Sequence, residues 1–291
     1  MRTAFWHNPV VWTPWLVFAL AAALRLHTIG AKEMWLDEAF SVWIADHSLL
    51  EGWRWLALID QHPPLYYALL HGWQRLFGDL QGSVRTLSAL SGALAIPFFY
   101  GAIRRFFDDN VGLIAALILA ISPYHVRYGQ ETRMYALLTL AVAAAFYCLA
   151  RVLVSVEPGR RNRVAWLGLA VTQAAVMLTH NSAAVFFPLA LNVSIFVALW
   201  LRRRGFVDSS LPALDQPHFL RRWLLIQGIA LLLWSPWALP FLDQARLVDR
   251  EFWILAPTAQ LVLDAFQHYN FAYLPTWLPA PWLWNLLYGL L

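Results

Sequence analysis

Two adjacent carboxylates, Asp37 and Glu38, follow the first apolar run of the chain in the motif Trp35-Leu36-Asp37-Glu38-Ala39. A carboxylate at the boundary between lipid and water can accept a proton as a general base, and ionisable groups at a membrane are candidates for functional sites. Acids also suit the first turn of a helix, where they interact favourably with the helix macrodipole. The motif alone therefore leaves open whether the pair is catalytic or caps a helix.

A second polar segment, Arg127-Tyr128-Gly129-Gln130-Glu131-Thr132-Arg133-Met134-Tyr135, lies between two later apolar runs. Guanidinium groups bind phosphate oxygens in a bidentate manner, and the low dielectric near a membrane strengthens this bond. Arg127 and Glu131 are also four residues apart, a spacing that permits an ion pair on one helix face. The segment indicates either a phosphate site or a structural cluster of ion pairs.

Two histidines are weaker candidates. His62 belongs to Gln61-His62-Pro63-Pro64, which could simply open a helix, because proline is common in a first turn. His180 precedes Asn181 between two apolar runs, and a single histidine at a helix end is usually structural. Both become candidates for a site only through their expected position on the same membrane face as the acid pair and the arginines.

The composition places the chain in a bilayer. Of its 291 residues, 60% are hydrophobic, only 13% are charged, and 17 are Trp, so the surface of a water-soluble fold would be largely apolar. A net charge of +4 is compatible with a nucleic-acid partner, but the arginines occur as short clusters between apolar runs, which is typical of cytoplasmic loops. We therefore predict an all-α, polytopic integral membrane bundle that does not bind nucleic acid.

A membrane-spanning helix needs about 20 apolar residues, or fewer where partners cover its ends. We predict one transmembrane domain over residues 1–291, with spans near 10–26, 83–103, 111–124, 133–154, 164–179, 182–201 and 223–242, and a last apolar stretch at 277–291.

Segment 63–77 is apolar but carries His71, Gln74 and Arg75, so it could cross the bilayer or lie on it. If it lies on the surface, the arginine clusters at 104–105, 160–163, 202–204 and 221–222 all fall on one side, as the positive-inside rule requires. We therefore predict an external loop over 27–82 with amphipathic surface helices at 37–45 and 49–59. Segment 127–135 then forms the second external turn, and residues 180 and 181 form the third.

In combination, the acid pair after the first span, the His-Pro-Pro sequence and the Arg-Met-Tyr turn resemble the polyprenyl-phosphate-sugar glycosyltransferases of the GT-C superfamily. The similar branch contains the dolichyl-phosphate-mannose protein mannosyltransferases and the lipid A aminoarabinose transferase. The resemblance covers about residues 26–135 and extends more loosely to His180. Members of this family are usually longer, so we expect the chain to be truncated at its C-terminal end relative to them.

The resemblance implies an inverting enzyme in the cell membrane that moves a sugar from a polyprenyl-phosphate donor to an acceptor hydroxyl on the external or periplasmic face. It implies that Asp37 is the catalytic base and that Glu38 positions the acceptor or helps to organise the base. It implies no metal and no other cofactor, and the acceptor could be a protein, lipid A or another glycan. The candidates for binding the donor phosphate or sugar are His62, Arg127, Glu131, Arg133, Tyr135 and His180.

Two other classes of function stay open. A transporter or lipid flippase should carry charges near the bilayer midplane and two halves of similar hydropathy, and neither feature is evident in the sequence. A truncated relative without catalytic activity, retained as a partner subunit, would be consistent with the short chain.

Overall fold

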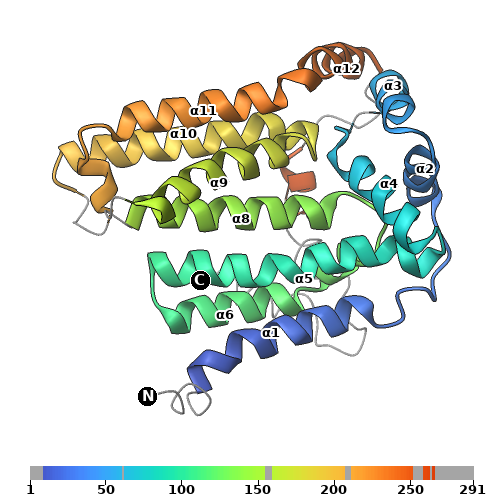
Figure 1. The fold of residues 1–291 in the computed structure, drawn as a ribbon, viewed down its shortest axis with the longest axis horizontal. Helices are drawn as coiled ribbons and strands as arrows, with labels where there is room; N and C mark the ends of the chain where they lie inside the picture. The colour runs from blue at the N-terminus through green and yellow to red at the C-terminus, as the bar shows by residue number, and fades with distance from the viewer. Residues whose placement is uncertain are drawn as a thin grey trace.

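The computed structural model of the protein describes residues 9–60, 62–154, 159–206, 211–251, 258–262, 264 and 265. Within these ranges the chain is helical and has no strand. Its elements (Figure 1) are α1 (Pro9–Leu26), α2 (Leu36–Asp46), α3 (Leu49–Ile59), α4 (Leu65–Phe77), α5 (Gln81–Phe106), α6 (Asp109–Ile121), α7 (Pro123–Gly129), α8 (Tyr135–Val154), α9 (Arg160–Met177), α10 (Asn181–Arg203), η1 (Pro212–Asp215), α11 (Phe219–Trp234), η2 (Ser235–Trp237) and α12 (Ala238–Glu251).

The long helices lie side by side in two groups that meet where α5 packs on α8 (Figure 1). Helices α1, α5 and α6 form one group around Ala21, Ile96 and Ala116, and α8, α9, α10 and α11 form the other around Leu169 and Trp223. Many of the core residues are alanines, which allow helix axes to approach closely within a membrane. The result is a bundle whose two ends are formed by loops and short helices.

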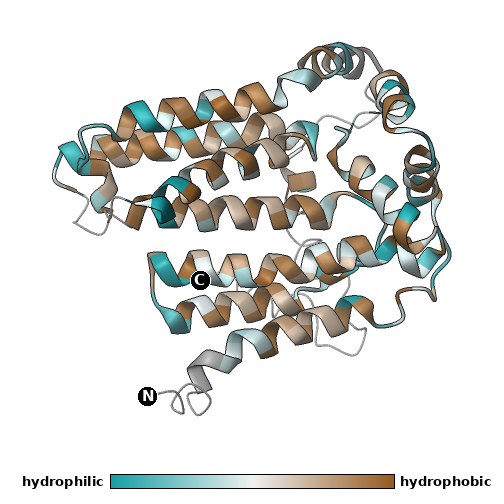
Figure 2. Ribbon diagram, viewed as in Figure 1, coloured by the Kyte–Doolittle hydropathy of each residue, from teal (hydrophilic) through white to brown (hydrophobic). Residues whose placement is uncertain are grey.

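The bundle carries the apolar surface that a bilayer requires. Four helical runs are long and apolar enough to cross a membrane, namely Gln81–Phe106, Tyr135–Val154, Asn181–Arg203 and Phe219–Arg246, and a fifth arises if α6 and α7 count as one bent span. The most apolar part of α10 is only 11% buried, and hydrophobic residues cover the middle of the helices (Figure 2). Such a surface is stable in lipid and not in water, so the predicted membrane bundle is confirmed.

Two of the predicted spans, at 164–179 and 10–26, form helices that do not qualify as membrane-spanning by length and composition. The first turn of α9 contains three arginines, so this helix is not among the candidate spans, although it packs between its neighbours within the bundle. The apolar part of α1, Trp12–Leu26, is shorter than the helices that qualify as candidate spans. The predicted stretch at 277–291 lies outside the described residues.

A buried arginine explains why the predicted span at 111–124 ends early. Helix α6 stops at Ile121, and α7 continues at an angle of 58° to it, so part of the expected turn at 127–135 is helical. Arg25 of α1 is fully buried and donates hydrogen bonds to the carbonyls of Leu119 and Ala120, which have lost their helical partners, and it also contacts His125. It thereby fixes the direction of α7.

Close packing around Arg25 depends on two glycines. A Cβ atom added to Gly92 would lie 3.0 Å from the Nε atom of Arg25, and one added to Gly129 would lie 3.0 Å from its Cδ atom. Real Cβ atoms rarely make contacts this short, so any larger residue would displace the arginine or the helices. Glycine at both positions lets α5 and α7 enclose the guanidinium.

Helices α2, α3 and α4 gather at one end of the bundle (Figure 1). The surface helices predicted at 37–45 and 49–59 correspond to α2 and α3, and a capping box between Ser48 and Glu51 starts α3. With 13 residues, α4 is about 20 Å long, which is shorter than the hydrocarbon layer. Gly78, with φ of 77°, ends α4 in a conformation that suits glycine.

Candidate active site

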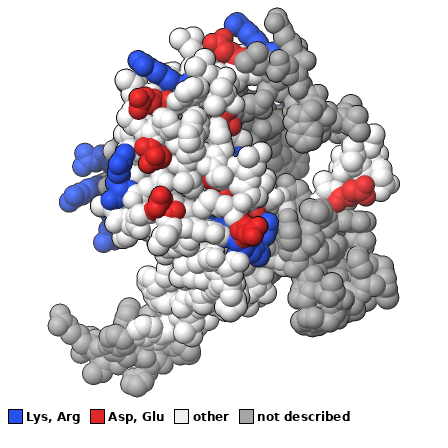
Figure 3. All heavy atoms as spheres, turned by 90° about the vertical axis from the view of Figure 1, so that its right-hand side faces the viewer, with Lys and Arg blue, Asp and Glu red and all other residues white. Residues whose placement is uncertain are grey.

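The sequence-predicted residues meet at the end formed by α2, α3 and α4. The first turn of α2 lies against the connection between α7 and α8, which is residues 130–134, and the end of α9 and start of α10 lie beside them. Figure 3 looks onto this end and shows acidic side chains spread over the described surface, several of them beside basic ones.

The two carboxylates of the acid pair have different surroundings. Successive helix positions point about 100° apart, so Glu38 faces the protein while Asp37 faces outward. The side chain of Glu38 is 1% exposed, and that of Asp37 is 42% exposed. The pair therefore does not act as one unit.

Glu38 is a buried anion whose two oxygens are occupied. Arg85 of α5 donates from Nε to Oε1 over 2.8 Å and from Nη2 to Oε2 over 2.7 Å, and the amide of Thr132 donates to Oε1 over 2.7 Å. Burial alone would raise the pKa of Glu38, but the hydrogen bonds from Arg85 and Thr132 hold it below the usual value. Of the two roles expected for Glu38, these contacts fit organising the site and not binding an acceptor.

Arg85 connects the acid pair to the preceding loop. Besides Glu38, it donates to the backbone carbonyls of Ile29, Lys32 and Glu33, so all five of its N–H groups have acceptors. Arg85 is not among the residues predicted from the sequence, although an arginine within a predicted apolar span is a signal in itself.

Arg133 contacts the exposed acid. Its Nη2 atom lies 3.7 Å from Oδ2 of Asp37, and Nη1 donates to the Asp37 carbonyl and to Oγ of Ser41, each over 3.3 Å. Burial would lower the pKa of Arg133, but Tyr67, Tyr135, Asp37 and other neighbours raise it, so the group stays cationic. Its Nε atom is buried and has no hydrogen-bond partner among the described residues, which leaves a donor available for a ligand.

Arg127 and Glu131 form the ion pair that their spacing permits, with 2.9 Å between Nε and Oε1. The Glu131 side chain is 6% exposed, and its Oε2 atom has no hydrogen-bond partner within the described part of the chain. Burial, only partly offset by Arg127, raises the pKa of Glu131. This second buried acid is thus less well neutralised than Glu38.

His62 and His180 approach each other with 5.5 Å between ring centroids. The Nδ1 atom of His62 lies 2.9 Å from Oδ1 of Asp60, whose other oxygen accepts a 2.7 Å hydrogen bond from Tyr67. Burial, with His62 and Arg133 nearby, lowers the pKa of His180 to about 4, so this imidazole is neutral at pH 7. Its Nδ1 atom accepts from the amide of Ser182 and caps α10.

Tyr135 joins the arginine segment to this histidine pair. Its ring packs edge-on against Tyr128 at 4.8 Å between centroids and lies 6.3 Å from the ring of His180. Asp60 and Tyr67 belong to the same cluster, but the sequence analysis did not select them. Asp60 is two residues before His62 in the sequence, whereas Tyr67 is identified by its hydrogen bond to Asp60.

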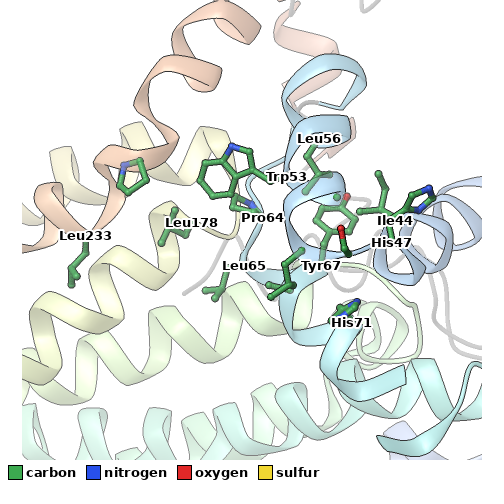
Figure 4. Close-up of a pocket in the computed structure, with 15 residues that line it drawn as sticks. Ile44, His47, Trp53, Leu56, Pro64, Leu65, Tyr67, His71, Leu178 and Leu233 are labelled. Carbon is green, nitrogen blue, oxygen red and sulfur yellow. The ribbon is translucent and has the colours of Figure 1, made fainter. Parts of the chain in front are cut away.

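A mostly apolar cavity of about 320 Å³ adjoins the cluster (Figure 4). Tyr67 belongs to both, since its ring lines the cavity and its hydroxyl binds Asp60. The other walls come from α3, α4, the end of α9 and the α11–η2 region, including Trp53, Leu65, Leu178 and Leu233. Within the described ranges, no three His, Cys, Asp or Glu residues are grouped so as to hold a metal ion.

Residues 61–216 match the family model of the dolichyl-phosphate-mannose-protein mannosyltransferases, and this segment is more than half of the chain. The chain belongs to this family. Because it is a GT-C family, the protein is a membrane glycosyltransferase. Searches of curated proteins and of solved structures gave no significant match.

The family match differs in extent from the resemblance seen in the sequence. It starts after Asp37 and Glu38 and continues beyond His180, whereas we expected about 26–135 with a looser extension to His180. The matched segment contains the histidines, the arginine segment and Tyr135. The acid pair is tied to it by contacts in space, through Arg85, Thr132 and Arg133.

Proposed function

We propose that the protein transfers a sugar from a polyprenyl-phosphate donor to an acceptor hydroxyl, with inversion, and that Asp37 is the general base. The observation that carries this proposal is the contact between Asp37 and Arg133. The half-exposed Asp37 carboxylate lies 3.7 Å from the buried, permanently cationic guanidinium of Arg133. A proton acceptor and an anion-binding group are thereby held at one position, next to an apolar cavity.

In this mechanism Asp37 removes the proton from the acceptor hydroxyl as the acceptor oxygen bonds to the anomeric carbon. The bond between that carbon and the phosphate oxygen breaks, and its electron pair leaves with the polyprenyl phosphate. Attack opposite to the leaving group inverts the anomeric centre. Asp37 can reach an acceptor because its side chain is 42% exposed, whereas Glu38 cannot because both of its oxygens are occupied.

The leaving phosphate monoester needs cations more than a proton donor. Arg133 has a free Nε donor, and Arg127 is 34% exposed beside Glu131. His62 is the third candidate, with Asp60 and Tyr67 fixing its ring. His180 is neutral at pH 7, so we assign it a hydrogen-bonding role, and Tyr135 packs beside it at the donor site.

We also propose that this end faces the external or periplasmic side. The arginine clusters lie at the opposite ends of α5, α9, α10 and α11, and such clusters remain on the cytoplasmic side of a membrane. The acceptor, whether protein, lipid A or another glycan, would approach from the external water.

The test is a transfer assay with the full chain in proteoliposomes and a labelled polyprenyl-phosphate sugar. Release of free polyprenyl phosphate serves as a readout that needs no identified acceptor, and NMR of the labelled product gives its anomeric configuration. We expect release by the wild type and an inverted product. A product with retained configuration, or uptake of intact donor without its cleavage, would overturn the proposal.

A further inference from the structure

The end of the bundle opposite to the candidate active site contains a cleft of about 740 Å³ between α9 and α11. We call it the α9–α11 cleft. Its mouth is lined by Arg163 and Arg222, which belong to the first turns of the two helices, together with Gln216. None of these residues has a part in the proposed transfer reaction.

The two arginines of the cleft have no acidic partner in the part of the chain that the structure describes. Arg104 pairs with Asp109 and Arg202 pairs with Asp215 at this same end, but no carboxylate pairs with Arg163 or Arg222 among the described residues. Arg222 donates a long hydrogen bond of 3.5 Å to Gln216. Two guanidinium groups from separate helices thus line one hollow without a compensating charge from the described residues, and an anion between them would be strongly favoured.

Beyond the arginines, the walls of the cleft are apolar. On α9 the arginine is followed at helical spacing by Trp166 and Leu167, and on α11 by Leu225, Ile226 and Ile229. Residues at i, i+3, i+4 and i+7 share one helix face, so each helix presents a cation and then a hydrocarbon stripe. Leu167 and Leu225 are 55% and 63% exposed, which leaves the stripe open to a ligand.

We propose that the α9–α11 cleft binds an anionic glycerophospholipid. The headgroup phosphate lies between Arg163 and Arg222 at the helix ends, and an acyl chain follows the apolar stripe toward the middle of the bilayer. A basic pocket between transmembrane helices at the cytoplasmic boundary suits such a lipid. A small phosphate compound would use the mouth of the cleft but not its walls.

Native mass spectrometry of the full chain in detergent tests this site. The probes are phosphatidylglycerol, phosphatidylcholine with the same acyl chains, and glycerol 3-phosphate. We expect retention of phosphatidylglycerol over phosphatidylcholine, and a loss of at least about tenfold in affinity for the pair Arg163→Gln and Arg222→Gln. The matched control is Arg161→Gln with Arg221→Gln, which removes the same charge from exposed neighbours on the same helices outside the cleft.

The control pair should change phosphatidylglycerol affinity by less than about twofold, since it leaves the cleft intact. Leu225→Gln should also weaken phosphatidylglycerol binding, because it interrupts the apolar stripe. Equal losses in the two arginine pairs, or equal retention of the two lipids, would overturn the proposal. Displacement of phosphatidylglycerol by an equal concentration of glycerol 3-phosphate would overturn the assignment to a lipid. Activity enters none of these readouts, so failure here is independent of the proposed reaction.

Discussion

The two ends of the bundle differ in how far their arginines are buried and in whether acidic side chains contact them. At the end with the candidate active site, Arg85 and Arg133 are only 3% and 4% exposed, and each contacts an acid. At the other end, Arg104 is 45% exposed, and the arginines of the α9–α11 cleft face no described acid. Burying a charge is costly unless hydrogen bonds and an opposite charge replace water, so the first end must be built around fixed partners. Exposed arginines need no such geometry and can instead set orientation or bind lipid.

The largest effect should come from Arg85→Met. This change leaves Glu38 buried without its cation, and removing one partner of a buried ion pair typically costs about 3–5 kcal/mol. Thermal unfolding in detergent should show a large decrease in the midpoint. Adding Glu38→Gln to the same protein should restore part of the loss, because it removes the uncompensated charge.

Arg133→Gln should mainly affect binding of the donor. Loss of a charge-assisted hydrogen bond is worth about 1.5–3 kcal/mol, so we expect KM for the donor to rise about tenfold to a hundredfold. Steady-state kinetics with the labelled donor measures this. Arg75→Gln is the matched control, since Arg75 lies at the same end but, among the described residues, donates a hydrogen bond only to the Asp46 carbonyl. An unchanged KM in Arg133→Gln would remove this residue from the donor site.

A smaller and pH-dependent effect should come from His180. Its pKa is about 4 in the folded protein against 6.5 ordinarily, so the unfolded chain binds more protons between these values. Stability should therefore be fully present above pH 6.5 and decrease as the pH falls toward 4. His180→Asn should flatten this decrease in the unfolding midpoint, while His218→Asn, at an exposed residue of the opposite end, controls for the loss of one imidazole. Equal pH profiles for wild type and His180→Asn would contradict the assignment.

The smallest effect should come from Arg104→Gln. Its ion pair with Asp109 is about half exposed, and exposed pairs contribute about 0–1 kcal/mol. The unfolding midpoint should barely move, and added salt should erase the difference. A loss comparable with that of Arg85→Met would show that burial does not distinguish the two ends.

Much of the candidate site could be predicted, because hydrophobic periodicity indicates the helices and the arginine clusters indicate the membrane topology. Amphipathic spacing predicted the helices that form as α2 and α3, and the arginine clusters indicated which segments share a membrane face. The meeting of the acid pair with segment 127–135 followed from this shared face.

Specific pairing in space could not be predicted from one sequence. Glu38 binds groups that are 47 and 94 residues away, and periodicity reveals which face of a helix is buried but not what it meets. The bend between α6 and α7 depends in the same way on Arg25, which is 95 residues before the carbonyl of Ala120. Arginines within apolar runs indicate such sites, but their partners can be identified only from a structure.

The most direct test of the central claim separates donor binding from transfer in Asp37→Asn, with Asp46→Asn as the control from the exposed end of the same helix. If Asp37 is the base and the cations hold the donor, the variant should bind donor within a few-fold of wild type. Its transfer rate should fall by about 10²-fold or more. Transfer at the wild-type rate in Asp37→Asn, measured beside an unaffected Asp46→Asn, would contradict the proposed mechanism.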